Sequence, residues 1–150
     1  MKLALHVNEI LVERDVEPDV TLVEFLRAHL ELTGTHVGCN NGICGSCTVL
    51  LNGEAVRACL LLAVQVDGAS ITTVEGLGGR QLSALQQAFV EYGAVQCGFC
   101  IPGMLVTATA LLKSTPNATR AQIVTALDGN LCRCTGYVKI IEAVAAASAA

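Results

Sequence analysis

The stretch GCNNGICGSC, from Gly38 to Cys47, contains three cysteines in a Cys-x4-Cys-x2-Cys spacing. A fourth cysteine follows after eleven intervening residues, on the far strand of a hairpin that Asn52-Gly53 predicts. This spacing is typical of a plant-type [2Fe–2S] site, in which four thiolates hold two irons. The candidate ligands of this first cysteine group are Cys39, Cys44, Cys47 and Cys59.

The glycines of this loop support the same interpretation. A loop that wraps an anionic cluster turns its backbone amides inward, which requires unusual φ values. Gly38, Gly42 and Gly45 can adopt such values without penalty. Zinc also accepts four thiolates, but zinc sites usually combine two short Cys-x2–4-Cys motifs, and only Cys44 and Cys47 form one here. The spacing therefore favours iron–sulfur over zinc.

The other four of the eight cysteines form a second group with the spacing Cys-x2-Cys-x31-Cys-x-Cys. These are Cys97, Cys100, Cys132 and Cys134. The two pairs fall between predicted helices, and in a bundle both connections can lie at the same end, so that the thiols converge. From spacing alone, a second iron–sulfur cluster and a structural zinc ion both remain open. Disulfides are disfavoured because the N-terminus lacks the apolar core of a secretory signal, which predicts a cytoplasmic protein.

The first half of the chain is predicted to be rich in strands. Apolar and polar residues alternate from Lys2 to Val7, and Asn8-Glu9 turns the chain into a second strand over residues 10–16. A second hairpin surrounds Asn52-Gly53, and a short strand follows at residues 70–74. One amphipathic helix is predicted by the apolar residues Leu22, Phe25, Leu26 and Leu30. Two hairpins and one helix indicate a small α+β domain.

Every pattern is helical after the segment from Gly76 to Arg80, which is the best linker candidate. Four helices are predicted by the stripes Leu82, Leu85, Phe89, Tyr92; Met104, Leu105, Ala108, Leu111, Leu112; Ile123, Val124, Leu127; and Ile140, Ile141, Val144. Pro102 suits the first turn of the second helix, and Gly129 is the predicted C-cap of the third. Short connections favour a four-helix bundle. We therefore expect two domains, at residues 1–76 and 77–150.

The composition excludes several classes of function. Hydrophobic residues make up 53% and charged residues 15% of the 150 residues, which is the opposite of a disordered chain. With a net charge of -4 and few aromatic residues, the chain lacks the basic and aromatic surface that binds nucleic acids. Its apolar runs are too short to span a membrane. The mean hydropathy of +0.57 implies more apolar surface than so small a chain buries alone, which predicts burial in a larger complex.

Three stretches of the sequence, GTHVGCNNGICGSCTV, VQCGFCIPGM and GNLCRCTGY, carry a resemblance that covers almost all of the chain. They resemble the iron–sulfur small subunit of the molybdenum hydroxylases, the family of xanthine oxidase and carbon monoxide dehydrogenase. The resemblance implies a plant-type ferredoxin-like β-grasp domain followed by a helical domain, each with one [2Fe–2S] cluster. It thereby makes the second cysteine group a cluster site rather than a zinc site.

The resemblance also implies a role in electron transfer. Cys97, Cys100, Cys132 and Cys134 would face the molybdopterin of a large catalytic subunit. Cys39, Cys44, Cys47 and Cys59 would face the FAD of a medium subunit, in a heterotrimer that dimerises. Gln96 matches a family glutamine that contacts the pterin, and its amide offers donors and an acceptor to a heterocycle edge. This chain itself would do no substrate chemistry, as part of a multi-subunit oxidoreductase.

Two other functions fit the sequence less well. A free-standing, two-cluster electron carrier needs a charged docking surface, which the low charge density disfavours. A zinc-stabilised interaction module would have no redox role. No Gly-x-Gly-x-x-Gly loop is present to hold a flavin or a nicotinamide, and His6, His29 and His36 are too scattered to be predicted as ligands.

Overall fold

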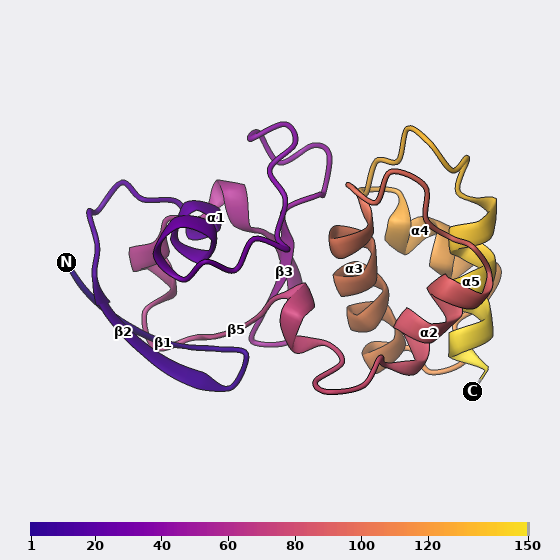
Figure 1. Ribbon diagram of the computed structural model, residues 1–150, viewed down its shortest axis with the longest axis horizontal. Helices are drawn as coiled ribbons and strands as arrows, with labels where there is room; N and C mark the ends of the chain where they lie inside the picture. The colour runs from indigo at the N-terminus through magenta and orange to yellow at the C-terminus, as the bar shows by residue number, and fades with distance from the viewer. Residues whose placement is uncertain (150) are drawn as a thin grey trace.

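The N-terminal part of the chain is built on a five-stranded mixed sheet, seen at the left of Figure 1, in the order β2-β1-β5-β3-β4. Only β1 and β5 pair in parallel, and the other neighbours are antiparallel. The strands are β1 (Lys2–Val7), β2 (Ile10–Asp15), β3 (Thr48–Leu51), β4 (Glu54–Arg57) and β5 (Ser70–Thr72). The computed structural model describes residues 1–149, so that only the last residue of the expected second domain lies outside it.

Both predicted hairpins are present, and their turns explain why. Asn8 and Glu9 join β1 to β2 with φ values of 49° and 70°, and Asn52 and Gly53 join β3 to β4 with 51° and 91°. Two central residues in the left-handed region make the tight turn that follows the natural twist of paired strands. Glycine and asparagine tolerate this conformation best, so Asn52-Gly53 fixes the register that brings Cys59 back toward the cysteine loop.

The predicted helix at residues 22–30 is present but irregular. One α-helical turn, α1 (Leu22–Glu24), continues into a π-helical turn, η1 (Phe25–His29), where the Leu30 N–H donates to the Phe25 carbonyl at 3.2 Å. Thr21 caps its start through a reciprocal capping box with Glu24. The side chains of Leu22, Phe25 and Leu26 are buried beneath the sheet, as the helical spacing predicted.

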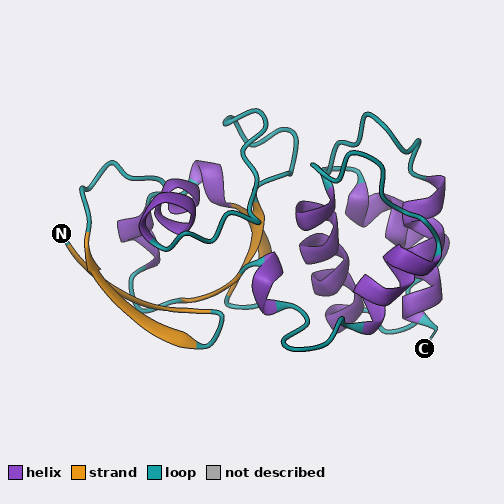
Figure 2. Cartoon of the chain, viewed as in Figure 1, coloured by secondary structure: helices purple, strands orange, loops and turns teal. Residues whose placement is uncertain are grey.

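The C-terminal part is helical, as Figure 2 shows. Its helices are α2 (Ala84–Glu91), α3 (Ile101–Ser114), α4 (Arg120–Leu127) and α5 (Val138–Ser148). Ser83 and Thr119 cap α2 and α4 through capping boxes, and Pro102 lies in the first turn of α3, where its missing N–H costs nothing. Among residues 1–149, no helix is both long and apolar enough to cross a membrane.

Three details of the helical prediction are wrong. Leu82 and Tyr92 lie outside α2 and are 57% and 40% exposed, because the helix is shorter than the apolar stripe. Gly129 does not adopt the left-handed conformation of a C-cap. A Cβ at Gly129 would instead stand 2.6 Å from the Arg57 guanidinium, so the absence of a side chain makes room for a residue of β4.

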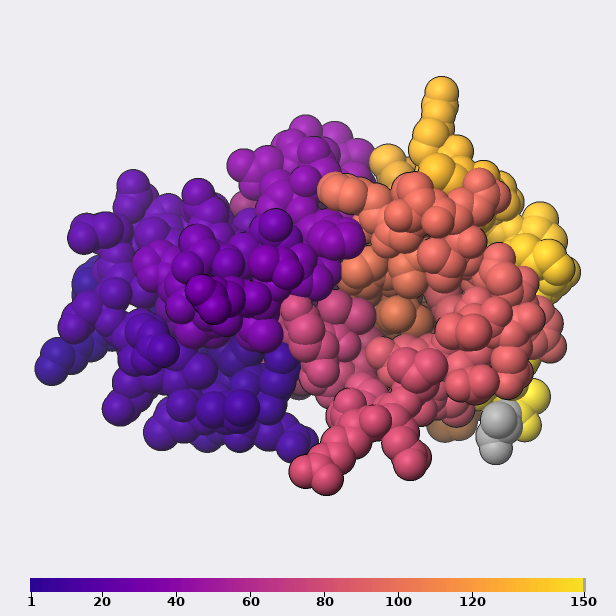
Figure 3. Space-filling view, in the orientation of Figure 1, coloured from indigo at the N-terminus to yellow at the C-terminus, as the bar shows by residue number. Residues whose placement is uncertain are grey.

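The chain encloses two hydrophobic cores, one under the sheet and one among the helices. Phe25, Leu26 and Ile71 are buried in the first core, and Phe89, Met104 and Ile140 in the second. Figure 3 shows the two parts in direct contact across the middle of the molecule, and Figure 1 shows α3 facing β3 there. Helix α3 therefore both fills the helical core and packs against β3, the strand that follows the cysteine loop.

A matched pair of leucine substitutions tests where the helical core ends. Leu85 is buried and Leu82 is exposed, although both lie on the same predicted stripe. We expect Leu85→Ala to lower the free energy of unfolding by about 2–5 kcal/mol, because it leaves a cavity. Leu82→Ala should change it by less than about 0.5 kcal/mol. Equal losses in chemical denaturation would contradict this boundary of the core.

Candidate iron–sulfur sites

The first cysteine group lies on an irregular loop between η1 and β3. The backbone N–H of Cys44 points at the Sγ of Cys39 at 3.3 Å, and the N–H of Asn41 does so at 3.5 Å. Asn40, Gly42 and Gly45 have φ values of 54°, 82° and 75°, which turn successive amides toward the inside of the loop. The sequence therefore folds here into a cradle of N–H donors around sulfur.

Gly38 differs from the prediction, because its φ is not in the left-handed region. A Cβ at this position would stand 2.9 Å from the Cys44 sulfur. What the loop needs at Gly38 is space for a thiol rather than an unusual backbone conformation.

Cys59 reaches the loop from the short 3-10 helix η2 (Ala58–Leu60), which directly follows β4. It contacts Cys47, and both side chains are buried, at 7% and 2% exposure. Cys44 lies near Cys47 as well. The hairpin and the loop thus bring the four cysteines of the first group near one another.

The second group is formed by two connections at one end of the helices. Cys97 and Cys100 lie between α2 and α3, and Cys132 and Cys134 lie between α4 and α5. Cys100 contacts Cys132, and Cys97 contacts Cys134, so that each pair combines one thiol from each connection. All eight cysteines are free thiols. The predicted convergence of the four thiols is therefore present.

Hydrogen bonds lower the pKa of some cysteine thiols, and burial raises the pKa of others. The amides of Cys44 and Asn41 lower the pKa of Cys39 to about 6, whereas burial raises the pKa of Cys47 to about 11 and that of Cys100 to about 12. Burial alone would raise the pKa of Cys132, but the hydroxyl and amide of Thr135 outweigh it and lower that pKa. A metal that binds these buried thiols must displace their protons, and its positive charge then offsets the cost of burying the thiolates.

The connection before α5 is held by Tyr137. Its hydroxyl accepts the Cys132 N–H at 2.8 Å and donates to the Asn130 carbonyl at 3.1 Å. Its own backbone has a φ of 69°, which turns the chain into the helix. Tyr137 thus shapes the loop that presents Cys132 and Cys134.

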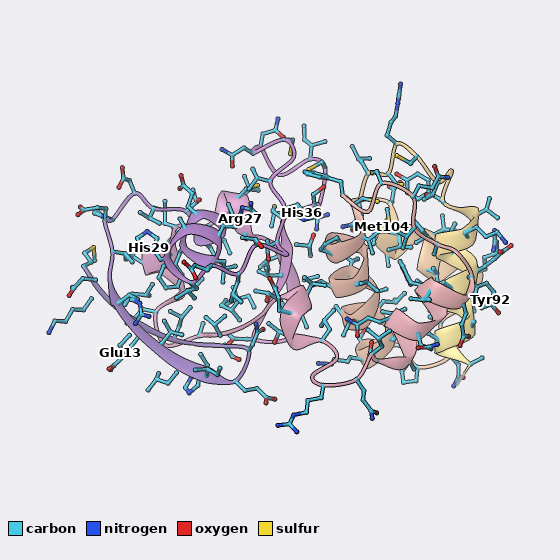
Figure 4. All side chains as sticks on the ribbon, viewed as in Figure 1. Glu13, Arg27, His29, His36, Tyr92 and Met104 are labelled. Atoms are coloured by element: carbon cyan, nitrogen blue, oxygen red, sulfur yellow. The ribbon has the colours of Figure 1, made fainter. Side chains whose placement is uncertain are left out.

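Gln96 and the three histidines lie at or near the surface. Gln96 is exposed next to Cys97, and no hydrogen bond of its side chain is found in the described chain. His36 stacks on Phe99 with ring centroids 4.8 Å apart, and Figure 4 shows it where the two parts of the chain meet. His29 stacks on Phe25, and His6 is exposed. Within residues 1–149, no three His, Cys, Asp or Glu side chains are placed around a single metal ion.

The donor set fits [2Fe–2S] clusters. Such a cluster takes two thiolates on each of two irons. Three of the thiol pairs join different segments of the chain, namely Cys47 with Cys59, Cys97 with Cys134, and Cys100 with Cys132. Backbone N–H groups directed at sulfur are the donors that tune cluster potentials. A family model described as "2Fe-2S iron-sulfur cluster binding domain" matches residues 5–83, and one described as "[2Fe-2S] binding domain" matches residues 73–145. The chain is thus an iron–sulfur protein with two [2Fe–2S]-binding domains.

Similar proteins narrow this class. The nicotine 6-hydroxylase small subunit of Paenarthrobacter nicotinovorans is 53% identical over 86% of this chain and 78% of that protein. Caffeine dehydrogenase subunit gamma of Pseudomonas sp. (strain CBB1) is 48% identical over 97% of this chain and 90% of that protein. The crystal structure of quinoline 2-oxidoreductase from Pseudomonas putida 86 matches with a TM-score of 0.96 and 46% identity, over 99% of this chain and 94% of that chain. The chain belongs to the family of iron–sulfur small subunits of molybdenum hydroxylases.

This membership confirms the α+β fold, the two [2Fe–2S]-binding domains and the role as an electron-transfer subunit of an oxidoreductase. Sequence reasoning missed the contacts that join the two cysteine groups. The Leu131 N–H donates to the Cys44 carbonyl at 2.8 Å, and His36 Nδ1 lies 2.8 Å from the Phe99 carbonyl oxygen. Both contacts span more than sixty residues of sequence, so that no local pattern could have revealed them.

The pKa difference between the thiols predicts selective alkylation in chain from which iron has been removed. Cys39, with a pKa of about 6, is a thiolate at pH 7, whereas Cys100, with a pKa of about 12, keeps its proton. Because the thiolate is the nucleophile, iodoacetamide at pH 7 should label Cys39 well before Cys100, as read by peptide mass spectrometry. In urea the two rates should converge. In iron-free chain that circular dichroism shows to be folded, equal rates without urea would contradict the preformed cradle.

Proposed function

We propose that Cys39, Cys44, Cys47 and Cys59 bind one [2Fe–2S] cluster, and that Cys97, Cys100, Cys132 and Cys134 bind the other. The observation that carries this is the meeting of eight free thiols in two groups, each formed by a turn-rich loop and a distant second segment. When bound, the clusters supply one-electron chemistry. The chain's own part is to hold the thiolates, direct N–H groups at sulfur and limit the access of water.

The two cores support a division into two domains, with the boundary between residues 76 and 77. The first would be a plant-type ferredoxin-like β-grasp domain, and the second a four-helix bundle formed by α2 to α5. Val74 and Leu77, on either side of that boundary, both pack against the helical core. The connection between the domains is therefore anchored rather than free.

The partners we propose are a large molybdopterin subunit and a medium FAD subunit, in a heterotrimer that dimerises in the cytoplasm. Apolar side chains that are about half exposed flank both cysteine groups, which is the kind of surface that protein partners cover. They are Val37, Ile43 and Leu60 beside the first group, and Val95, Phe99 and Leu131 beside the second. The second group, whose Cys97 and Cys134 are exposed, would face the molybdopterin, as the resemblance to the molybdenum hydroxylases implies.

Gln96 is the proposed contact to the pterin. It is exposed, it directly precedes Cys97, and its side-chain amide is free to donate and accept hydrogen bonds outside the chain. An electron that leaves the pterin would then reach the second cysteine group through this residue's immediate neighbour. The role proposed for Gln96 is therefore to orient the pterin edge toward Cys97.

A free-standing electron carrier is the alternative to a subunit. Charged residues make up only 15% of the chain, and the surface beside both cysteine groups is apolar, which suits a lasting interface better than a transient one. Affinity purification of the tagged chain from its native host separates the two. Two larger chains should co-purify with it, whereas elution alone near 15.6 kDa would support the carrier.

Removal of one proposed ligand tests the assignment of the first cluster. Cys59→Ala should abolish the cluster of the sheet domain, halve the iron content and expose that domain to protease, because so small a core depends on its metal. The second cluster should keep its EPR signal, which serves as the internal control. Full iron content and unchanged protease resistance would remove Cys59 from the ligand set.

Substitution of Gln96 tests the contact to the pterin in the assembled complex. Gln96→Ala should leave both clusters intact but slow the reduction of the second cluster by substrate by about tenfold or more, because the pterin loses an orienting hydrogen bond. Rapid mixing with optical detection measures this rate. Gln86→Ala, at an amide that caps the start of α2 eleven residues before Cys97, is the control. An unchanged rate in Gln96→Ala would exclude Gln96 from the path.

A further inference from the structure

A buried polar side chain joins the two cysteine-bearing parts of the chain. Asn130 is 1% exposed, and its Nδ2 donates to the Gly45 carbonyl at 3.0 Å and reaches Thr48 Oγ1 at 3.5 Å. Its Oδ1 accepts the hydroxyl of Thr107, on α3, at 3.0 Å. One amide thus binds the cysteine loop, the start of β3 and a core helix at once.

Arg57, on β4, contacts the same region, here called the junction, where Asn130 meets Gly45, Thr48 and Thr107. Its Nη1 donates to Thr48 Oγ1 at 2.6 Å, and its Nη2 donates to the Gly129 carbonyl at 2.7 Å. Thr48 Oγ1 in turn donates to the Gly45 carbonyl at 2.6 Å. Every polar atom of the Asn130 amide and of the Thr48 hydroxyl therefore has a partner, and a fully satisfied buried network is rigid.

The backbone at this junction is packed too closely for side chains. A Cβ at Gly103 would collide with the Gly45 carbonyl oxygen, and a Cβ at Gly45 would collide with the Gly129 carbonyl oxygen. These neighbours are backbone atoms, which cannot move aside as a flexible side chain can. The three glycines come from the three segments that carry Cys44 and Cys47, Cys100, and Cys132.

The junction therefore lies directly between the two cysteine groups. Asn130 stands two residues before Cys132, and Gly45 stands next to Cys44. The hydrogen bond from the Leu131 N–H to the Cys44 carbonyl runs beside it. The stack of His36 on Phe99 adds a contact between the segment before the cysteine loop and the α2–α3 connection, and Figure 4 shows His36 where the two parts of the chain meet.

We propose that Asn130 is a positioning residue for electron exchange, which fixes the separation and orientation of the two clusters from within this chain. The inference rests on the ligand sets of the proposed function. Functional groups are held to within about 0.5 Å of their working positions by neighbours whose own hydrogen bonds are satisfied. Asn130 is such a neighbour for the cysteine loop of the first group and for the α4–α5 connection of the second. The clusters would keep this geometry before any partner subunit binds.

A set of threonine variants of the cluster-loaded protein tests this role without removing Asn130. Thr107→Val keeps the shape of the side chain but removes the donor to Asn130 Oδ1, and Thr107→Ser keeps the donor. Thr109→Val makes the same change on the same helix at a hydroxyl for which no hydrogen bond is found in the described chain. Asn130→Leu is the stronger variant, and Thr107→Val carries the test if Asn130→Leu does not fold.

Two readouts are compared in these variants, namely the magnetic splitting between the two reduced clusters in EPR and the hydrogen exchange of the Leu131 amide. We expect Thr107→Val and Asn130→Leu to retain both clusters, to change or broaden the splitting, and to speed the Leu131 exchange by about tenfold or more. Thr107→Ser and Thr109→Val should match the wild type in both readouts.

Wild-type splitting in Thr107→Val and Asn130→Leu would overturn the proposal. If exchange alone became faster, Asn130 would stabilise the fold without setting the cluster geometry, and the proposal would be equally wrong. A wild-type chain without two [2Fe–2S] signals would instead overturn the proposed function, and this inference with it. Iron and sulfide analysis of the wild type separates that failure from the others.

Discussion

The N–H groups that face the Cys39 sulfur are the constraint on which the rest of this structure depends. To turn them inward, the loop needs Asn40, Gly42 and Gly45 in the left-handed region. A loop with so little regular secondary structure does not hold its shape alone, and it is anchored by β3 on one side and by α3 and Asn130 on the other. The sheet, the hairpin turn and the helical cap can each be understood as support for this one loop.

The size of the two parts makes metal binding a question of stability as well as of function. Each part encloses a core of its own. Domains of roughly 70–80 residues usually need a disulfide, a metal site or a similar link in addition to such a core. Burial holds the pKa of Cys47 and Cys100 far above neutrality. Because a metal takes the place of those protons, cluster binding and folding are coupled in both parts. Cluster binding thus contributes to the stability of both parts, as packing in the cores does.

Much of this molecule could be predicted from sequence, because its decisive signals are local. Asn52-Gly53 predicted the β3–β4 turn, Pro102 the start of α3, and the cysteine spacing the two groups of thiols. What could not be predicted depends on contacts between distant segments. The role of Gly129 is set by Arg57 rather than by its own helix, and the exposure of Leu82 by where α2 begins. The junction at Asn130 likewise unites residues 85 positions apart, which periodicity cannot detect.

The most direct test of the account is the content of iron and acid-labile sulfide per chain, together with EPR spectroscopy after reduction by dithionite. The account predicts about four irons and four sulfides per chain, and two distinct [2Fe–2S] signals, one from each domain. Two irons with one signal in freshly isolated protein would leave one cysteine group without its assigned role. Zinc in place of iron, without sulfide, would contradict the electron-transfer function altogether.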